Sequence, residues 1–178
     1  VRTMSTLAPQ LEKRSVDPNK LFLDPNNPRL FTKEEEKVPL ENVTDPGVQD
    51  RTTERIFNDK DTFSINELIQ AILIRGYVPE AGGYMFVRAL PAKGQYIVLE
   101  GNRRLTAIRK ILAKKEEYQA VYPDAIRSLK KIDVLEIVDE ISEEELQIKI
   151  SYLLGTSHHG SKKHWSPFAE AKEVFTTY

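Results

Sequence analysis

The sequence contains no cysteine. This absence excludes disulfide bonds, thiol catalysis and thiolate metal sites within the chain. The sequence also lacks an apolar run near the roughly 18 residues that a membrane-spanning helix needs, and its N-terminus has no apolar segment typical of a signal peptide. We therefore expect a cytoplasmic protein without a membrane partner.

The sequence also lacks an excess of charge of one sign, because it contains 26 Lys and Arg residues and 27 Asp and Glu residues. The total charge therefore gives no reason to expect a nucleic-acid partner. The charges are nevertheless unevenly distributed: residues 101–131 hold nine basic and three acidic residues, and residues 132–154 hold one basic and seven acidic. The basic block indicates either an anion site or simply solvated helix faces.

The 178 residues, 40% of them hydrophobic, are enough for one domain with a real core. Residues 1–19 have little periodicity and are expected to form a flexible arm. The domain itself is expected over residues 20–154, with an insertion or mobile cover at about 31–61. Within that insertion, Asp45 and Pro46 predict the start of one helix that runs to about Phe57.

The regular pattern begins at Ser64, where a capping box predicts a helix that Gly76 ends. Two apolar runs at 84–90 and 96–99 predict a hairpin. The elements expected after it are a helix over 103–113, a helix over 116–129, a strand from Ile132, a capped helix from Ser142 to Gly155, a polar loop to Trp165 and a last helix from Ser166. Because the sequence stops inside that last helix, we expect further domains C-terminal to residue 178.

The most informative segment is the end of the second hairpin strand, where Glu100 and Gly101 lead directly into a helix. A helix N-terminus presents free backbone N–H groups and a positive dipole end to an anion. Gly101 permits close approach of a phosphate, and Arg103 and Arg104 add bidentate donors. The segment predicts a phosphate site; alternatively, the two arginines face solvent or pair with the acidic segment.

The run Gly-Asn-Arg-Arg-Leu-Thr-Ala at 101–107 resembles the Gly-x-Arg-Arg-x-x-Ala box of the ParB/sulfiredoxin superfamily. The order of the surrounding elements is also similar, from the Asn-Asn-Pro-Arg element at 26–29 to the Ser-Pro start of the last helix. The resemblance covers about residues 21–178 without the 31–61 stretch. It implies a small α+β domain, with a mixed sheet and packed helices, that binds CTP or ATP with Mg²⁺.

Carried over by position, the resemblance implies a set of phosphate-contacting residues around the helix start. If the nucleotide is hydrolysed, Glu100, Arg103 and Arg104 are the catalytic candidates, and Glu100 is the candidate metal ligand. The nucleotide-binding candidates in this region are Gly101, Asn102, Arg103, Arg104, Thr106 and Arg29.

Two departures from the family narrow this expectation. Sulfiredoxins place a catalytic cysteine where this chain has Asn102, so sulfinic acid reduction is excluded. ParB proteins carry a Glu-Asn-x-x-Arg box after the acidic helix, and the corresponding stretch here, residues 154–159, has no acidic residue. This absence argues against CTP hydrolysis by the ParB route.

The polar loop contains all three histidines of the chain. Three interpretations stay open: metal ligation by imidazole, an exposed polar connection, or a second anion-contacting loop. In the last case the ligand would be contacted by Thr156, Ser157, His158, His159 and Lys162.

Taken together, these patterns predict a nucleotide-dependent switch or NTPase in a DNA-associated bacterial protein, and they leave a homodimer open. One alternative is a DNA-cleaving nuclease, but metal-dependent cleavage usually needs several carboxylates and Glu100 is the only one in the box. The other is a non-catalytic DNA- or protein-binding module that uses the 101–131 basic block on phosphate backbones.

Overall fold

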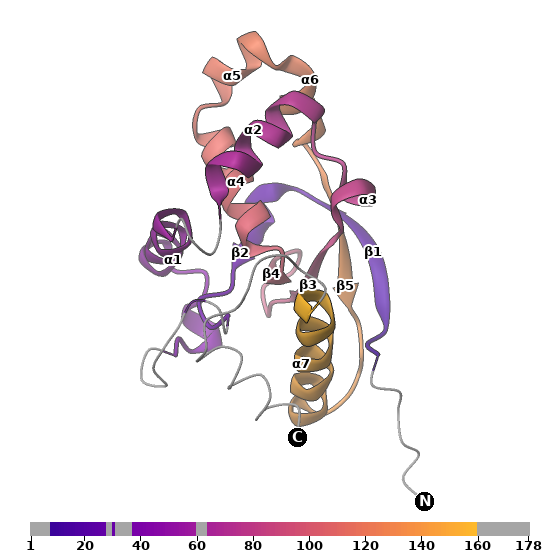
Figure 1. Cartoon of the computed structure of the whole chain (residues 1–178). Helices are drawn as coiled ribbons and strands as arrows, with labels where there is room; N and C mark the ends of the chain where they lie inside the picture. The colour runs from indigo at the N-terminus through magenta and orange to yellow at the C-terminus, as the bar shows by residue number, and fades with distance from the viewer. Residues whose placement is uncertain (1–7, 28–29, 31–36, 60–63, 160–178) are drawn as a thin grey trace, which may run out of the picture.

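The computed structural model describes residues 8–27, 30, 37–59 and 64–159. It is an α+β fold with one five-stranded mixed sheet in the order β1-β5-β3-β4-β2 (Figure 1). β1 pairs with β5 and β3 with β4 antiparallel, whereas β3–β5 and β2–β4 are parallel. The strands are β1 (Leu11–Val16), β2 (Leu21–Leu23), β3 (Met85–Ala89), β4 (Tyr96–Glu100) and β5 (Ile132–Ile137).

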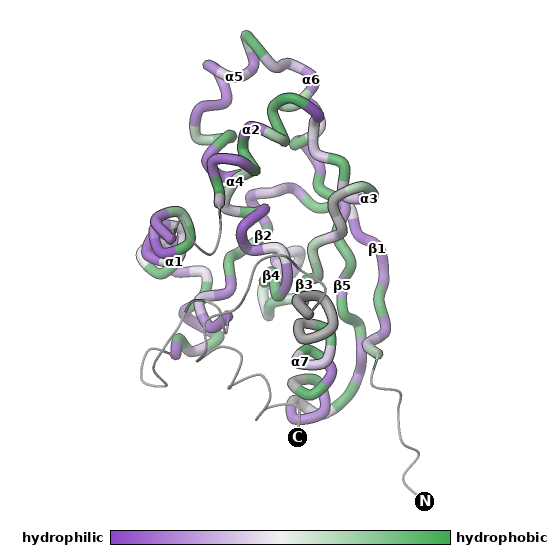
Figure 2. Tube along the Cα trace, in the orientation of Figure 1, coloured by the Kyte–Doolittle hydropathy of each residue, from purple (hydrophilic) through white to green (hydrophobic). Residues whose placement is uncertain are grey.

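The helices pack on both faces of this sheet. They are α1 (Pro46–Asn58), α2 (Ile65–Arg75), α3 (Pro79–Gly82), α4 (Asn102–Ala113), α5 (Lys115–Val121), α6 (Pro123–Ser128) and α7 (Glu143–His159), with 3-10 turns η1 (Pro18–Lys20) and η3 (Leu40–Asn42). Figure 2 shows hydrophobic segments in the sheet and in α2, whereas α5 is largely hydrophilic. Among the described residues, no helix is both long enough and apolar enough to cross a membrane.

Two hydrophobic cores lie on the two faces of the sheet, because neighbouring residues of a strand point to opposite sides. Val98 of β4 belongs to the larger core, together with Leu105 and Ile108 of α4. Its neighbours Ile97 and Leu99 belong to the smaller core, which α7 covers with residues such as Ile150. The larger core supports the start of α4, where the predicted phosphate site lies.

The hairpin, the strand from Ile132 and most helix starts are confirmed. Asp45 caps α1 by accepting hydrogen bonds from the N–H groups of Gly47 and Val48. Ser142 accepts a hydrogen bond from the Glu145 N–H at 3.2 Å, as its capping box predicts. Ser64 does precede α2, but its φ is +46° and its side chain makes no capping hydrogen bond.

The prediction of a flexible arm over residues 1–19 is wrong for residues 11–16, which form the edge strand β1; residues 1–7 lie outside the described residues. Five of its six residues are exposed, so the strand lacks the apolar alternation by which strands are recognised. Its side chains instead pair across to β5: Arg14 Nε lies 2.7 Å from Glu136, and Lys13 Nζ lies 3.4 Å from Asp133.

The described part of the 31–61 stretch is not a cover outside the fold. α1 buries Ile56 completely in the larger core, and Gln49 of the same helix is buried and bonded to β2. The helix is therefore a structural element of the domain.

Two predicted helix boundaries are also wrong. The helix expected over 116–129 is two helices, because Pro123 lacks an N–H and disfavours a helical residue before it. The helix expected to end at Gly155 is also longer than predicted, because α7 continues through Gly155 to His159. A glycine ends a helix when it adopts a left-handed conformation, as Gly76 does after α2 with φ +78°. The domain boundary expected at residue 154 therefore falls inside α7.

Candidate phosphate site at the start of α4

The turn into α4 requires a glycine for two reasons. Gly101 has φ +107°, a region that L side chains rarely adopt. A Cβ atom at this position would also overlap Cγ of Met85 on the neighbouring strand β3. Packing of the sheet against α4 therefore explains Gly101 without any ligand.

Asn102 and Thr106, both predicted to contact the nucleotide, are engaged inside the protein. Asn102 is buried; its Oδ1 accepts from the Asp24 N–H at 2.9 Å and its Nδ2 donates to the Val98 carbonyl at 2.9 Å. Thr106 has no exposed surface, and its hydroxyl donates to the Asn102 carbonyl. In this arrangement the Asn102 side chain joins the end of β2 to the start of α4, and the Thr106 hydroxyl lies in the core instead of at the helix opening.

Arg103 is different because its half-buried side chain lacks a complete set of partners. Its Nε is buried and has no hydrogen-bond partner among the described residues. Burial lowers the pKa of the guanidinium, and the neighbouring charge of Arg104 lowers it further, while Glu67 and Glu100 act in the opposite direction. The result is a desolvated cation that the described part of the protein satisfies only in part.

Arg104, the next residue of α4, reaches from the start of the helix towards α3. One of its Nη atoms donates to the carbonyl of Gly83, directly after α3. Tyr77 follows α2, and its buried hydroxyl lies beside the Arg104 guanidinium. Burial raises the pKa of Tyr77, and the charge and hydrogen bonding of Arg104 oppose that shift in part. Two cations and the unpartnered Nε of Arg103 thus lie around the start of α4.

The first turn of α4 adds no negative charge of its own, so the carboxylates that act on Arg103 are Glu67 and Glu100. The helix has no side-chain cap and no acidic residue in its first turn. Its positive dipole end therefore adds to Arg103 and Arg104. These are features that an anion site would use, and the binding of a phosphate at the start of α4 stays a prediction.

Glu100 is partly buried one residue before Gly101, and its charge acts on Arg103. Within the described part of the chain, no group of three or more His, Asp or Glu side chains is placed to hold a metal ion. The role of Glu100 as a metal ligand stays a prediction.

The second predicted phosphate-contacting segment is only partly described. Arg29 and Lys162 lie outside the described residues. Residues 155–159, which include Thr156, Ser157, His158 and His159, form the end of α7 and not the start of a loop. Their contact with the ligand stays a prediction.

The sequence-based reasoning missed Asp24, which lies beside Asn102. Its backbone N–H donates to Asn102, and its carboxylate accepts from the Asn26 N–H at 2.9 Å. Burial raises the pKa of Asp24 to about 6, although the Asn26 N–H and the charge of Lys37 oppose the shift. In the sequence, the Asp-Pro-Asn-Asn run indicates a turn, and nothing in it shows that the carboxyl group becomes buried.

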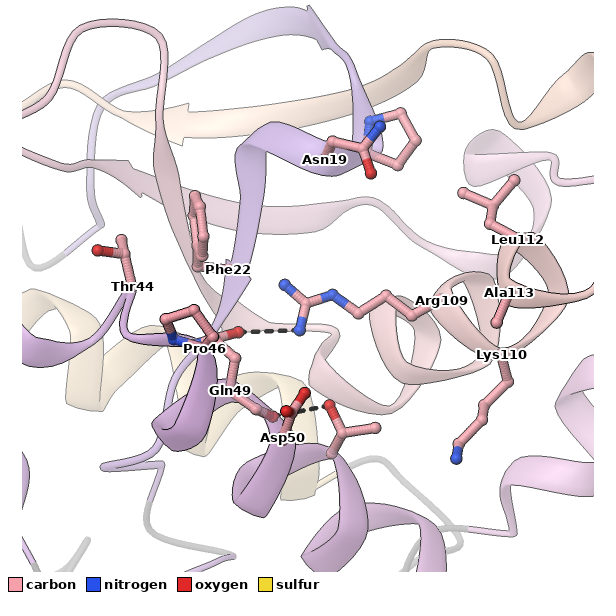
Figure 3. Close-up of a pocket in the computed structure, with 12 residues that line it drawn as sticks. Asn19, Phe22, Thr44, Pro46, Gln49, Asp50, Arg109, Lys110, Leu112 and Ala113 are labelled. Atoms are coloured by element: carbon pink, nitrogen blue, oxygen red, sulfur yellow. Dashed lines mark hydrogen bonds between the residues drawn. The ribbon is translucent and has the colours of Figure 1, made fainter.

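Arg109, two turns further along α4, was also missed. Its Nη1 donates to Gln49 Oε1 of α1 at 2.9 Å (Figure 3). Its Nη2 donates to the Leu21 carbonyl of β2 at 2.9 Å. Gln49 in turn accepts from the Leu23 N–H and donates to the Leu23 carbonyl, both at 2.9 Å. The two side chains thus complete the hydrogen bonding of the outer edge of β2, where a further strand would otherwise pair.

Comparison with known proteins adds no relative: no family model, curated protein or solved structure matches the chain.

Proposed function

We propose that this chain is a ParB-like nucleoside triphosphate-binding domain that holds the phosphates of CTP or ATP at the start of α4. The observation that carries the proposal is the buried Nε of Arg103, which has no partner among the described residues beside a second arginine and an uncapped helix start. Buried polar atoms in proteins are nearly always hydrogen-bonded. An anionic ligand at the accessible part of the guanidinium would balance the charge of this half-buried cation.

In this proposal the residues of the box divide into two groups. Gly101, Asn102 and Thr106 give the turn its shape, since each has a structural role within the fold. Arg103 and Arg104 bind the phosphates, together with the first backbone N–H groups of α4. The ligand is thus recognised mainly through charge and backbone geometry.

Magnesium fits this arrangement as an ion carried by the triphosphate. Mg²⁺ commonly keeps several waters and takes one or two protein carboxylates in addition to phosphate oxygens. Glu100 is the carboxylate beside the box, so it is the residue that would hold the ion. The ion would neutralise phosphate charge and supply Lewis-acid assistance if the nucleotide is hydrolysed.

The biological role that we propose is a nucleotide-dependent switch or NTPase in a DNA-associated protein. A triphosphate that bridges α4 and the α2–α3 segment would draw these elements together, and its loss would release them. This part of the proposal rests on the resemblance of residues 101–107 to the ParB box.

The test is a thermal-shift assay with CTP, ATP, GTP and UTP at millimolar concentration, with and without Mg²⁺. A ligand that binds only the folded state stabilises it by about 2.7 kcal/mol at a hundredfold excess over Kd. We expect one nucleotide to raise the melting temperature and the Arg103→Gln, Arg104→Gln double variant to lose most of that shift.

Arg127→Gln is the matched control, because the Arg127 side chain is 72% exposed and, within the described part of the chain, pairs with the surface residue Asp124. It should leave the nucleotide shift unchanged. If no nucleotide raises the melting temperature, or if the double variant keeps the full shift, the assignment of the site is wrong.

A further inference from the structure

A separate cleft of about 580 Å³ lies between α1, α4 and the η1–β2 segment (Figure 3). Its volume falls within the range of roughly 300–1,000 Å³ that is common for small-molecule sites. Its lining combines apolar and polar side chains: Pro18, Asn19, Phe22, Thr44, Pro46, Gln49, Asp50, Thr53, Arg109, Lys110, Leu112 and Ala113.

The guanidinium of Arg109 lies in the wall of this cleft. In Figure 3 it reaches from α4 towards Gln49 of α1. A guanidinium has five N–H donors, and the two hydrogen bonds of Arg109 go to neutral oxygens, those of Gln49 and Leu21. Among the described residues, no carboxylate lies within ion-pair distance of it. Its charge is therefore partly desolvated and has no close counter-ion in that part of the chain.

The charges that line the cleft add up to a single positive charge. Lys110, with its Nζ 4.4 Å from the centre of the Phe57 ring, contributes one cation at the rim. Asp50, an exposed residue of α1, contributes the one negative charge among the described lining residues. Burial lowers the pKa of Arg109, and the Asp50 charge opposes that shift. This balance suits a ligand with one negative charge.

We propose that the cleft binds an organic monoanion, a carboxylate attached to an apolar body. The carboxylate would accept N–H groups that Arg109 does not use within the fold, since guanidinium and carboxylate geometries match. The apolar body would lie against Phe22, Pro46 and Leu112. The proposal is independent of the nucleotide site, because Arg109 lies about 9 Å along the helix axis from Arg103 at 1.5 Å per residue.

The probe is benzoate, with benzamide as its uncharged counterpart of nearly equal shape. Both are titrated to about 20 mM, a range that reaches weak millimolar affinities, into the ¹⁵N-labelled full chain and followed by NMR. We expect benzoate to shift the Arg109 Nε–H and Gln49 side-chain amide signals, and benzamide to shift them at least about tenfold less at equal concentration, because it lacks the charge. Equal shifts from both probes, or none from benzoate, overturn the proposal.

Two charge variants distinguish ligand binding from a purely structural role of Arg109. Asp50→Asn should tighten benzoate binding and Lys110→Gln should weaken it, each by about threefold, as expected for partly screened charges. The melting temperatures of the ligand-free variants check that the fold is intact.

If benzoate shifts the Arg109 signal with the same affinity in the Asp50→Asn and Lys110→Gln variants as in the unchanged protein, the proposal is overturned. If benzoate shifts only the backbone signals of residues 101–104, the anion binds at the start of α4; this result overturns the present proposal and does not contradict nucleotide binding. If no nucleotide binds, the interpretation of the benzoate titration does not change.

Discussion

Arg103 and Arg109 are two arginines of one helix with different surroundings. Both are half-buried, and burial lowers the pKa of both. Arg109 donates to Gln49 and to the Leu21 carbonyl, so it holds α4 to β2 and α1. Arg103 has a buried Nε without a partner among the described residues. Burial alone therefore does not identify a functional residue; the hydrogen bonds that the fold leaves unmade are more informative.

The largest effect in this comparison is expected at Gln49, the partner of Arg109. Gln49→Leu removes the acceptor for Arg109 and for the Leu23 N–H, and the donor for the Leu23 and Val43 carbonyls. Because each buried group left without a partner costs about 1–3 kcal/mol, we expect a loss of about 4 kcal/mol in the free energy of unfolding. Urea denaturation measures it.

Thr53→Ala is the control on the same helix, because Thr53 is only partly buried and its hydroxyl bonds within α1. It should change stability by less than about 1 kcal/mol. A Gln49→Leu variant as stable as this control would show that β2 does not depend on side-chain hydrogen bonds.

The second effect concerns the turn that precedes Arg103. Gly101→Ala places a methyl group against Met85 at a positive φ, so we expect a loss of about 3 kcal/mol. Gly94→Ala in the hairpin turn is the matched control, since φ there is +78° and no atom lies within 4 Å of the added Cβ. It should lose only about 1 kcal/mol, the backbone contribution. Equal losses would mean that the Met85 contact is relieved easily.

The third prediction compares the two arginines directly. Arg109→Met breaks two part-buried hydrogen bonds, and we expect a loss of about 2 kcal/mol in unfolding free energy. Arg103→Met removes a partly desolvated cation, so we expect a change within about 0.5 kcal/mol, or a small gain. Denaturant titrations without nucleotide test both variants. A loss at Arg103 as large as that at Arg109 would assign both residues to the fold.

The smallest effect is a pH dependence from Asp24. Its pKa is about 6 in the folded state against 3.8 in the unfolded chain. Between about pH 4 and 6 the unfolded state loses its proton while the folded state keeps it, so stability falls as pH rises and is constant above about 6. We expect a decrease on the order of 1–2 kcal/mol, after discounting for partial solvent contact.

Asp24→Asn keeps an oxygen that accepts from the Asn26 N–H, and it should abolish this decrease in urea titrations between pH 4 and 7. Asp50→Asn, which replaces an exposed carboxylate of α1, should leave the decrease unchanged. If the Asp24→Asn difference does not vary with pH, the carboxyl group is better solvated than its position indicates.

The sequence predicts the elements whose own side chains specify them. The hairpin and α4 follow from apolar periodicity, and α1 follows from the Asp45–Pro46 cap. β1 was missed because it is an exposed edge strand, stabilised mainly by its pairing with β5. A long-range pairing of this kind leaves little trace in the local sequence.

In the candidate site, too, residues within one local sequence pattern were predicted, and residues that depend on distant partners were not. Glu100, Arg103 and Arg104 were identified from one contiguous run, and the structure places both arginines at the start of α4. Asp24 and Arg109 were not found, since their environments depend on partners 78 and 60 residues away, Asn102 and Gln49. Local pattern shows which polar groups are available, and tertiary contacts decide which of them the fold uses.

The edge of β2 has a consequence for the order of folding. This strand has only three residues, and its outer hydrogen bonds come from Gln49, 26 residues from Leu23, and from Arg109, 88 residues from Leu21. Contacts between residues so far apart in sequence form only after the cost of closing long loops has been met. β2 is therefore completed late, once α1 and α4 are in place. In the native protein, the exchange of the Leu23 amide hydrogen reports how often α1 opens.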